Sequence, residues 1–122
     1  MMLRVAIIGC GKIADVHASQ IQRIEGSQIV GVCDAEPLMG KQFYERFAAG
    51  GYFSNLTELL DRARPDVVHI TTPPESHFEL ARRSLEWGCH VYVEKPFTLN
   101  VTEARSLIAL ANERGLKLTA GH

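Results

Sequence analysis

The sequence has no long apolar run, almost no net charge and few cysteines. No apolar run approaches the roughly 18 residues that a membrane-spanning helix needs, and residues 5–8 are too short for a signal-peptide core. The formal net charge of -1 gives no basic field for nucleic acid or anionic lipid. Cys10, Cys33 and Cys89 are an odd number at wide spacings, which forms neither a disulfide framework nor a zinc pattern. We therefore expect a cytoplasmic protein with reduced thiols, no nucleic-acid or membrane partner and no metal site.

Short apolar runs alternate with longer amphipathic segments along all 122 residues, which is a length typical of one domain. Continuous apolar runs are typical of strands covered on both faces, and apolar residues about one turn apart are typical of helices. Strict alternation predicts an α/β fold with a doubly wound parallel sheet in a three-layer α/β/α arrangement. The expected strands are residues 3–8, 28–33, 66–71, 89–93 and 116–120, and the expected helices are residues 12–25, 38–49, 55–64, 76–87 and 100–114.

Two sequence patterns specify details of these helices. In the first helix, Ile13, Val16, Ile21 and Ile24 fall on one face, which we expect to pack on the sheet. Three helices begin with a capping-box-like pair, in which a polar N-cap residue precedes a glutamate by three positions. These pairs are Asn55 with Glu58, Ser76 with Glu79, and Asn100 with Glu103.

The first predicted strand leads directly into Gly9-Cys10-Gly11-Lys12-Ile13-Ala14, which matches the dinucleotide-binding pattern G-x-G-x-x-A. Gly9 permits a tight turn, Gly11 lets a pyrophosphate approach the backbone, and Ala14 allows the helix to pack closely on the strand. Free N–H groups at the helix start can hold the anion. Glycines also occur in purely structural turns, but a strand before the loop and a helix after it favour a Rossmann fold. The loop alone also permits FAD, whereas the pattern of a P-loop nucleotidase is missing.

Asp34 lies 20 residues after Ala14, at the end of the second predicted strand. An acidic residue about 20 positions after the glycine loop accepts hydrogen bonds from the adenosine ribose. Its charge would repel a 2′-phosphate, so NAD is favoured over NADP. The alternative is that Asp34 only caps a helix or turn.

Two further motifs lie where predicted strands end, at the edge of an open α/β sheet where ligands bind. Residues 71–74 form a Thr-Thr-Pro-Pro turn, and His77 follows in the first turn of a helix. Glu94-Lys95-Pro96 ends the next strand. Lys95 is a poor core residue unless its charge is paired, but it suits proton transfer near a reacting hydroxyl. The proline can fix the lysine backbone through a cis peptide. The alternatives are a surface or capping role for His77 and a surface charge pair at Lys95.

In this order, the motifs resemble the N-terminal half of the Gfo/Idh/MocA oxidoreductases. The resemblance also includes a closing Ala120-Gly121-His122 and covers the whole chain. It implies that Lys95 lies beside the nicotinamide and assists substrate binding and proton transfer, and that the turn at residues 72–74 and His77 line the nicotinamide side. The expected cofactor contacts are Gly9, Gly11, Lys12, Ile13, Ala14, Asp34, Thr71, Thr72, Pro73, Pro74, His77, Glu94 and Lys95.

The family's enzymes are usually well over twice as long as this chain, because a second α/β domain supplies most substrate contacts and the subunit interface. We therefore expect residues 1–122 to be an NAD(P)-binding domain without its C-terminal substrate and oligomerisation domain, with little or no turnover alone. The resemblance implies that the intact protein is a homo-oligomeric, NAD-dependent dehydrogenase of CH–OH groups in a sugar, inositol or related polyol.

Two other functions are compatible with the same motifs. The first is a non-enzymatic, NAD-sensing regulator, because the family resemblance extends to a transcriptional co-repressor and fold alone does not fix function. The second is biliverdin-reductase-like or imine-reducing chemistry on a related scaffold. The complete Glu94-Lys95-Pro96 tripeptide favours the enzyme over the regulator.

Overall fold

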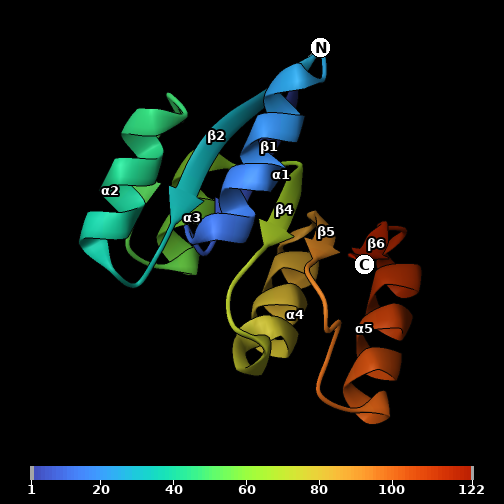
Figure 1. The fold of residues 1–122 in the computed structure, drawn as a ribbon. Helices are drawn as coiled ribbons and strands as arrows, with labels where there is room; N and C mark the ends of the chain where they lie inside the picture. The colour runs from blue at the N-terminus through green and yellow to red at the C-terminus, as the bar shows by residue number, and fades with distance from the viewer. Residues whose placement is uncertain (1, 122) are drawn as a thin grey trace.

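The computed structural model describes residues 2–121 and has the doubly wound α/β/α arrangement that the alternation predicts (Figure 1). Within these residues, six parallel strands form one sheet in the order β3-β2-β1-β4-β5-β6. The chain order reverses between β1 and β4, so the carboxyl end of β1 lies at the switch point where such sheets bind ligands. The strands are β1 (Leu3–Ile8), β2 (Ser27–Cys33), β3 (Tyr52–Phe53), β4 (Val67–Ile70), β5 (His90–Val93) and β6 (Leu118–Ala120). His122, the last residue of the closing motif, lies outside the described residues.

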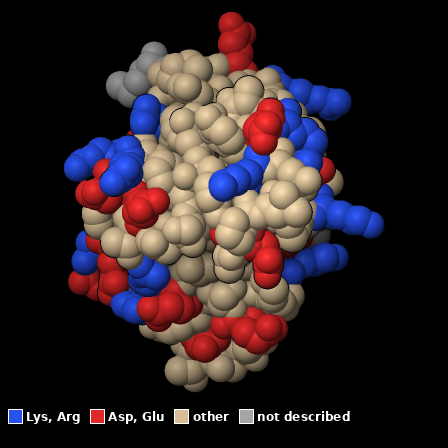
Figure 2. All heavy atoms as spheres, turned by 90° about the vertical axis from the view of Figure 1, so that its left-hand side faces the viewer, with Lys and Arg blue, Asp and Glu red and all other residues tan. Residues whose placement is uncertain are grey.

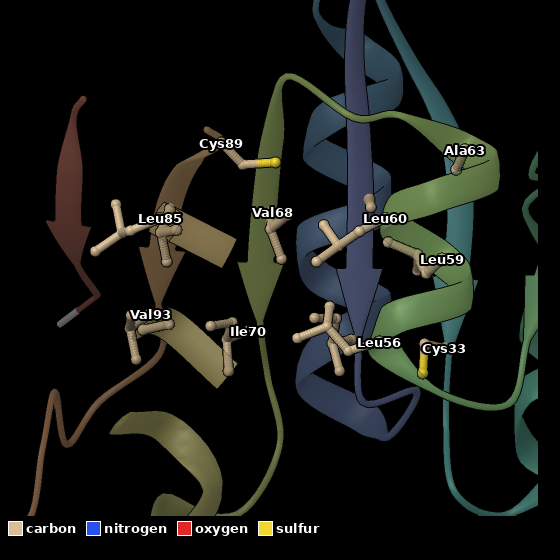
Figure 3. Close-up of a cluster of buried hydrophobic side chains, with 14 of the residues drawn as sticks. Cys33, Leu56, Leu59, Leu60, Ala63, Val68, Ile70, Leu85, Cys89 and Val93 are labelled. Atoms are coloured by element: carbon tan, nitrogen blue, oxygen red, sulfur yellow. The ribbon is translucent and has the colours of Figure 1, made fainter. Parts of the chain in front are cut away.

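Helices cover both faces of the sheet and bury two separate apolar clusters. Helices α1 (Lys12–Arg23) and α2 (Pro37–Arg46) pack on one face, mainly over β1 and β2. The larger cluster lies between the other face and α3 (Leu56–Ala63), α4 (His77–Trp87) and α5 (Val101–Arg114). Figure 3 shows side chains of this cluster from α3 and α4 gathered against β1, β4 and β5, among them Leu56, Leu60, Val68, Ile70, Leu85 and Val93.

Two of the three predicted helix caps are confirmed. The side-chain oxygens of Asn55 and Asn100 each accept a 2.9 Å hydrogen bond from the backbone N–H three residues later. The prediction for Ser76 is wrong, because a short 3₁₀ turn, η1 (Pro74–Ser76), precedes α4. The hydroxyl of Ser76 instead donates back toward the turn, with Thr72 Oγ1 at 2.6 Å and the Pro73 carbonyl at 2.9 Å.

The predicted inner face of α1 is also largely wrong. Ile13, Val16 and Ile24 are 40%, 50% and 57% exposed, and of the four predicted residues only Ile21 is buried. The helix instead turns small residues to the sheet, since Ala14 and Ala18 are completely buried. Small side chains allow the close helix–strand approach that the glycine loop needs, and this requirement outweighs the apolar stripe.

The surface carries both signs of charge. Figure 2 views the molecule from the side of α2 and shows acidic and basic side chains interspersed over that face. No helix within residues 2–121 has the length and apolar character needed to cross a membrane.

Candidate cofactor site

The two glycines of the loop meet different surroundings at the carboxyl edge of the sheet. Gly9 has a φ of +91°, and a Cβ there would lie 2.8 Å from Thr72 Cγ2 and 2.9 Å from the carbonyl of Thr71. Gly9 therefore lets the end of β1 touch the turn that follows β4. Gly11 is the N-cap residue of α1, and nothing lies within 4 Å of a Cβ built on it. That open space faces a helix N-terminus, where first-turn N–H groups have no intrahelical acceptor and favour an anion.

The other residues of the loop fit the same arrangement. Ala14 is completely buried on the sheet, as predicted. The side chains of Lys12 and Ile13 are exposed in the first turn of α1, with Ile13 at 40%. Any contact from this turn to a buried diphosphate would therefore come first from its backbone N–H groups. Gly11 has no side chain, so the space beside its backbone stays open and is suited to a diphosphate.

Asp34 is held against the glycine loop. Its Oδ2 accepts a hydrogen bond from the Cys10 N–H at 2.7 Å, and its Oδ1 accepts one from the Glu36 N–H at 2.8 Å. The second bond is the turn cap that the sequence allows as an alternative role. A carboxylate has about four acceptor positions, so capacity remains for the two hydroxyls of a ribose. The loop thus holds the carboxylate in the same pocket as the open space at Gly11.

One pocket joins these features. It has a volume of about 620 Å³, within the range of small-molecule sites, and it runs from Gly9 and Gly11 past Asp34 to Thr72 and Pro73. Sequence reasoning missed its far end, because the two-residue strand β3 was not expected and nothing linked the start of the helix that follows it to the pocket. That end is lined by Ser54, Asn55, Leu56, Leu80 and Arg83.

Cys10 lines the pocket but is not a reactive group. Its thiol is 4% exposed, and burial together with the neighbouring Asp34 carboxylate raises its pKa to about 12. The thiolate is the nucleophilic form of cysteine, so a thiol of this pKa stays inert at neutral pH. Among residues 2–121, no three His, Cys, Asp or Glu side chains gather as a metal site.

Thr71 and His77 connect the turns of the edge. The Thr71 hydroxyl lies 3.0 Å from the Ile8 carbonyl and 2.6 Å from that of Gly9. His77 is 1% exposed, and its two ring nitrogens lie 2.8 Å from the carbonyl oxygens of Thr72 and Pro96. The histidine therefore ties the turn after β4, which lines the pocket and leads into Pro74 of η1, to the turn after β5. Its predicted contact with the nicotinamide stays a prediction.

Glu94 and Lys95 point to different surroundings. The Glu94 carboxylate turns toward α1, where its Oε2 lies 2.8 Å from His17 Nε2. Lys95 is exposed and makes no ion pair within the part of the chain that the structure describes. The alternative of a surface charge pair between Glu94 and Lys95 is therefore wrong, because the carboxylate contacts His17 and the Lys95 side chain is exposed. The Lys95–Pro96 peptide is cis, as the sequence suggested.

The sequence analysis did not predict the side-chain network behind Glu94. His17 Nδ1 lies 2.9 Å from His69 Nδ1, and the His69 ring stacks on Tyr92 with 5.0 Å between centroids. Burial, reinforced by the neighbouring His17, lowers the pKa of His69 to about 4. His69 is therefore neutral at physiological pH.

This low pKa makes stability depend on pH. Between pH 6.5 and about 4, the unfolded chain binds a proton at His69 that the folded chain does not, so stability falls as pH falls. We expect the full effect to approach roughly 3 kcal/mol. Urea denaturation at pH 7 and pH 4.5 measures it, with His69→Asn as the non-titrating reference. Equal losses of stability in the two proteins would rule out this role for His69.

The fold and the pocket together define a dinucleotide-binding Rossmann domain. The chain belongs to the Gfo/Idh/MocA family: a model described as "Oxidoreductase family, NAD-binding Rossmann fold" matches residues 3–122. D-glucoside 3-dehydrogenase from Escherichia coli is 35% identical over 114 residues, which cover 93% of this chain and 32% of that enzyme. This chain thus spans about a third of the length of the curated relatives it matches.

Solved structures agree with this assignment. GenD2 from gentamicin A biosynthesis, in complex with NAD, is 32% identical with a TM-score of 0.95, and the match covers 98% of this chain and 34% of that one. The 3-ketoreductase KijD10 from Actinomadura kijaniata, in complex with NADP and TDP-benzene, is 31% identical with a TM-score of 0.91 and coverage of 98% and 37%. Similar domains therefore occur with either nicotinamide cofactor.

Proposed function

We propose that the protein to which this domain belongs is an NAD-dependent oxidoreductase acting on a CH–OH group of a sugar, inositol or related polyol. One observation carries the proposal: a single pocket joins the open space at Gly11, the Asp34 carboxylate and the turn at Thr72. His77 ties that turn to the segment containing Lys95. The sugar-dehydrogenase names of D-glucoside 3-dehydrogenase and other relatives support the substrate class.

Each group has a separate task in this proposal. The nicotinamide, when bound, supplies the hydride chemistry, and the protein binds and orients it. Asp34 accepts hydrogen bonds from the adenosine ribose and repels a 2′-phosphate, which favours NAD over NADP. The exposed Nζ of Lys95 exchanges a proton with the substrate hydroxyl. The proposal includes a homo-oligomeric full-length protein in the cytoplasm, and three buried, unpaired thiols support a reducing compartment.

The lysine tests the catalytic part of the proposal. In the full-length protein, we expect Lys95→Ala to lower kcat by about a hundredfold or more, because general acid–base catalysis typically contributes that much. The Kd for NAD should change little, since Lys95 lies outside the pocket that holds Gly11 and Asp34. NADH absorbance with a panel of polyols gives kcat, and calorimetry gives Kd. Lys41→Ala, which removes an exposed lysine on α2, is the matched control.

Two outcomes would contradict this function. Near-normal turnover in Lys95→Ala would remove the lysine from the mechanism. If no hydroxylated compound reduces NAD, while a protein partner binds with NAD-dependent affinity, the domain belongs to a non-enzymatic, NAD-sensing regulator instead.

A further inference from the structure

The far end of the pocket lies beyond the positions that the predicted contacts explain. In the proposed NAD site, the diphosphate lies at the open space beside Gly11 and the adjoining ribose lies at Asp34. The next part of the dinucleotide is the adenine, so it reaches the walls formed by the start of α3 and by α4. Leu56 and Leu80 on these walls suit the flat apolar faces of a purine.

Arg83 is the one Lys or Arg side chain among the residues that line this pocket. It sits on α4, one turn after Leu80, and is half-buried. Its guanidinium donates to the hydroxyl of Thr57 on α3 and makes no ion pair within residues 2–121. Arg83 lines both this pocket and a neighbouring hollow that contains Thr57, so the hydrogen bond anchors the side chain between the two while its charge stays unpaired.

The neighbouring arginine shows the contrast. Arg82 contacts both Glu79, at 2.6 Å, and Glu86, at 2.8 Å, on the outer surface of the same helix. Glu79 and Glu86 are also at one-turn spacing from Arg83, but both pair with Arg82, which leaves Arg83 without an ion pair within residues 2–121. A planar, half-buried and unpaired guanidinium is suited to stack on an aromatic ring.

We propose that Arg83 contacts the adenine of bound NAD, with its guanidinium covering one face of the purine. The inference rests on the proposed NAD site and adds the group that holds the adenine end of the cofactor. A 2′-phosphate in this pocket would meet the Asp34 carboxylate, which favours adenine as the ligand of Arg83.

Calorimetry on the 122-residue chain with NAD, AMP and NADP tests the proposal. Cation–π contacts of this kind predict that Arg83→Gln raises the Kd for all three by a similar factor, about tenfold. Thr57→Val, which frees the guanidinium but keeps it, should raise the same Kd values by a smaller factor. Arg105→Gln is the matched control, because it removes the same charge from an exposed position on α5 that does not line the pocket, and it should leave every Kd unchanged.

The outcomes separate the possible failures. Unchanged affinity for NAD and AMP in Arg83→Gln, with circular dichroism showing a folded protein, overturns the adenine contact. A loss confined to NADP overturns it too and assigns Arg83 to the 2′-phosphate. A loss for NAD without one for AMP places Arg83 on another part of the cofactor. A wild-type chain that binds none of the three nucleotides refutes the NAD site itself.

Discussion

Replacing Asp34 with alanine is expected to weaken NAD binding by about ten- to a hundredfold. Hydrogen bonds to a charged group contribute roughly 1.5–3 kcal/mol, and every 1.4 kcal/mol is a tenfold change in Kd. Binding of NADP should suffer less, because the carboxylate that repels a 2′-phosphate is removed with the lost hydrogen bonds. The ratio of the two Kd values, measured by calorimetry on one protein preparation, should therefore move toward NADP.

A second variant separates charge from geometry, because Asp34 also accepts hydrogen bonds from Cys10 and Glu36. Asp34→Asn keeps one side-chain oxygen to hold the loop but loses the negative charge. We expect it to shift the NAD-to-NADP ratio in the same direction as alanine, with a smaller loss of NAD affinity. If both variants keep the wild-type ratio, Asp34 only caps its turn.

The sequence predicted those parts of the site that are local in the chain. The strand–glycine–helix transition and the acidic residue at the end of the second strand are read from neighbouring residues, and the glycine conformations and the position of Asp34 agree with them. The cis bond before Pro96 was also suggested by the residue itself. Such features need no knowledge of which strands are neighbours.

The missed features depend on sheet order. His17 and Glu94 are 77 residues apart. They meet because the strand order β1-β4-β5 places the end of β5 close to the buried side of α1, where His17 lies. Arg83 reaches the pocket because α4 packs beside α3, which follows a strand of two residues that periodicity cannot detect. The glycine motif predicted the burial of Ala14, but a pattern of apolar residues cannot tell that α1 would also bury Ala18 rather than Ile13 or Val16.

The same added methyl group should lower NAD affinity at Gly11 and the free energy of unfolding at Gly9. In Gly11→Ala, the new Cβ meets no protein atom within 4 Å and the φ of -84° is allowed, so stability should change by less than about 1 kcal/mol. The methyl group would occupy the space in which the diphosphate must approach the helix N-terminus. We therefore expect affinity for NAD to fall more than about a hundredfold in a normally stable protein.

In Gly9→Ala, the methyl group meets Thr72 Cγ2 at 2.8 Å and backbone atoms of Thr71 at 2.9 Å, at a φ of +91°. Backbone strain and overpacking together should cost roughly 2–4 kcal/mol of the free energy of unfolding. Gly88→Ala isolates the first cause, because Gly88 also has a positive φ, +106°, but has nothing within 4 Å of an added Cβ and ends α4 away from the pocket. That control should lose about 1–2 kcal/mol and bind NAD normally.

Urea denaturation and NAD calorimetry on the same three proteins give both quantities. Because Gly11 and Gly9 lie two residues apart in one loop, a general disturbance of the loop would lower stability and affinity together in both variants. A loss of NAD affinity alone in Gly11→Ala would show that the ligand occupies the open space at the N-terminus of α1. A loss of stability alone in Gly9→Ala would show that protein atoms of Thr71 and Thr72 occupy the space next to Gly9. Wild-type NAD affinity in Gly11→Ala would show that the diphosphate binds elsewhere, and the assignments of Asp34 and Arg83 along the pocket would lose their starting point.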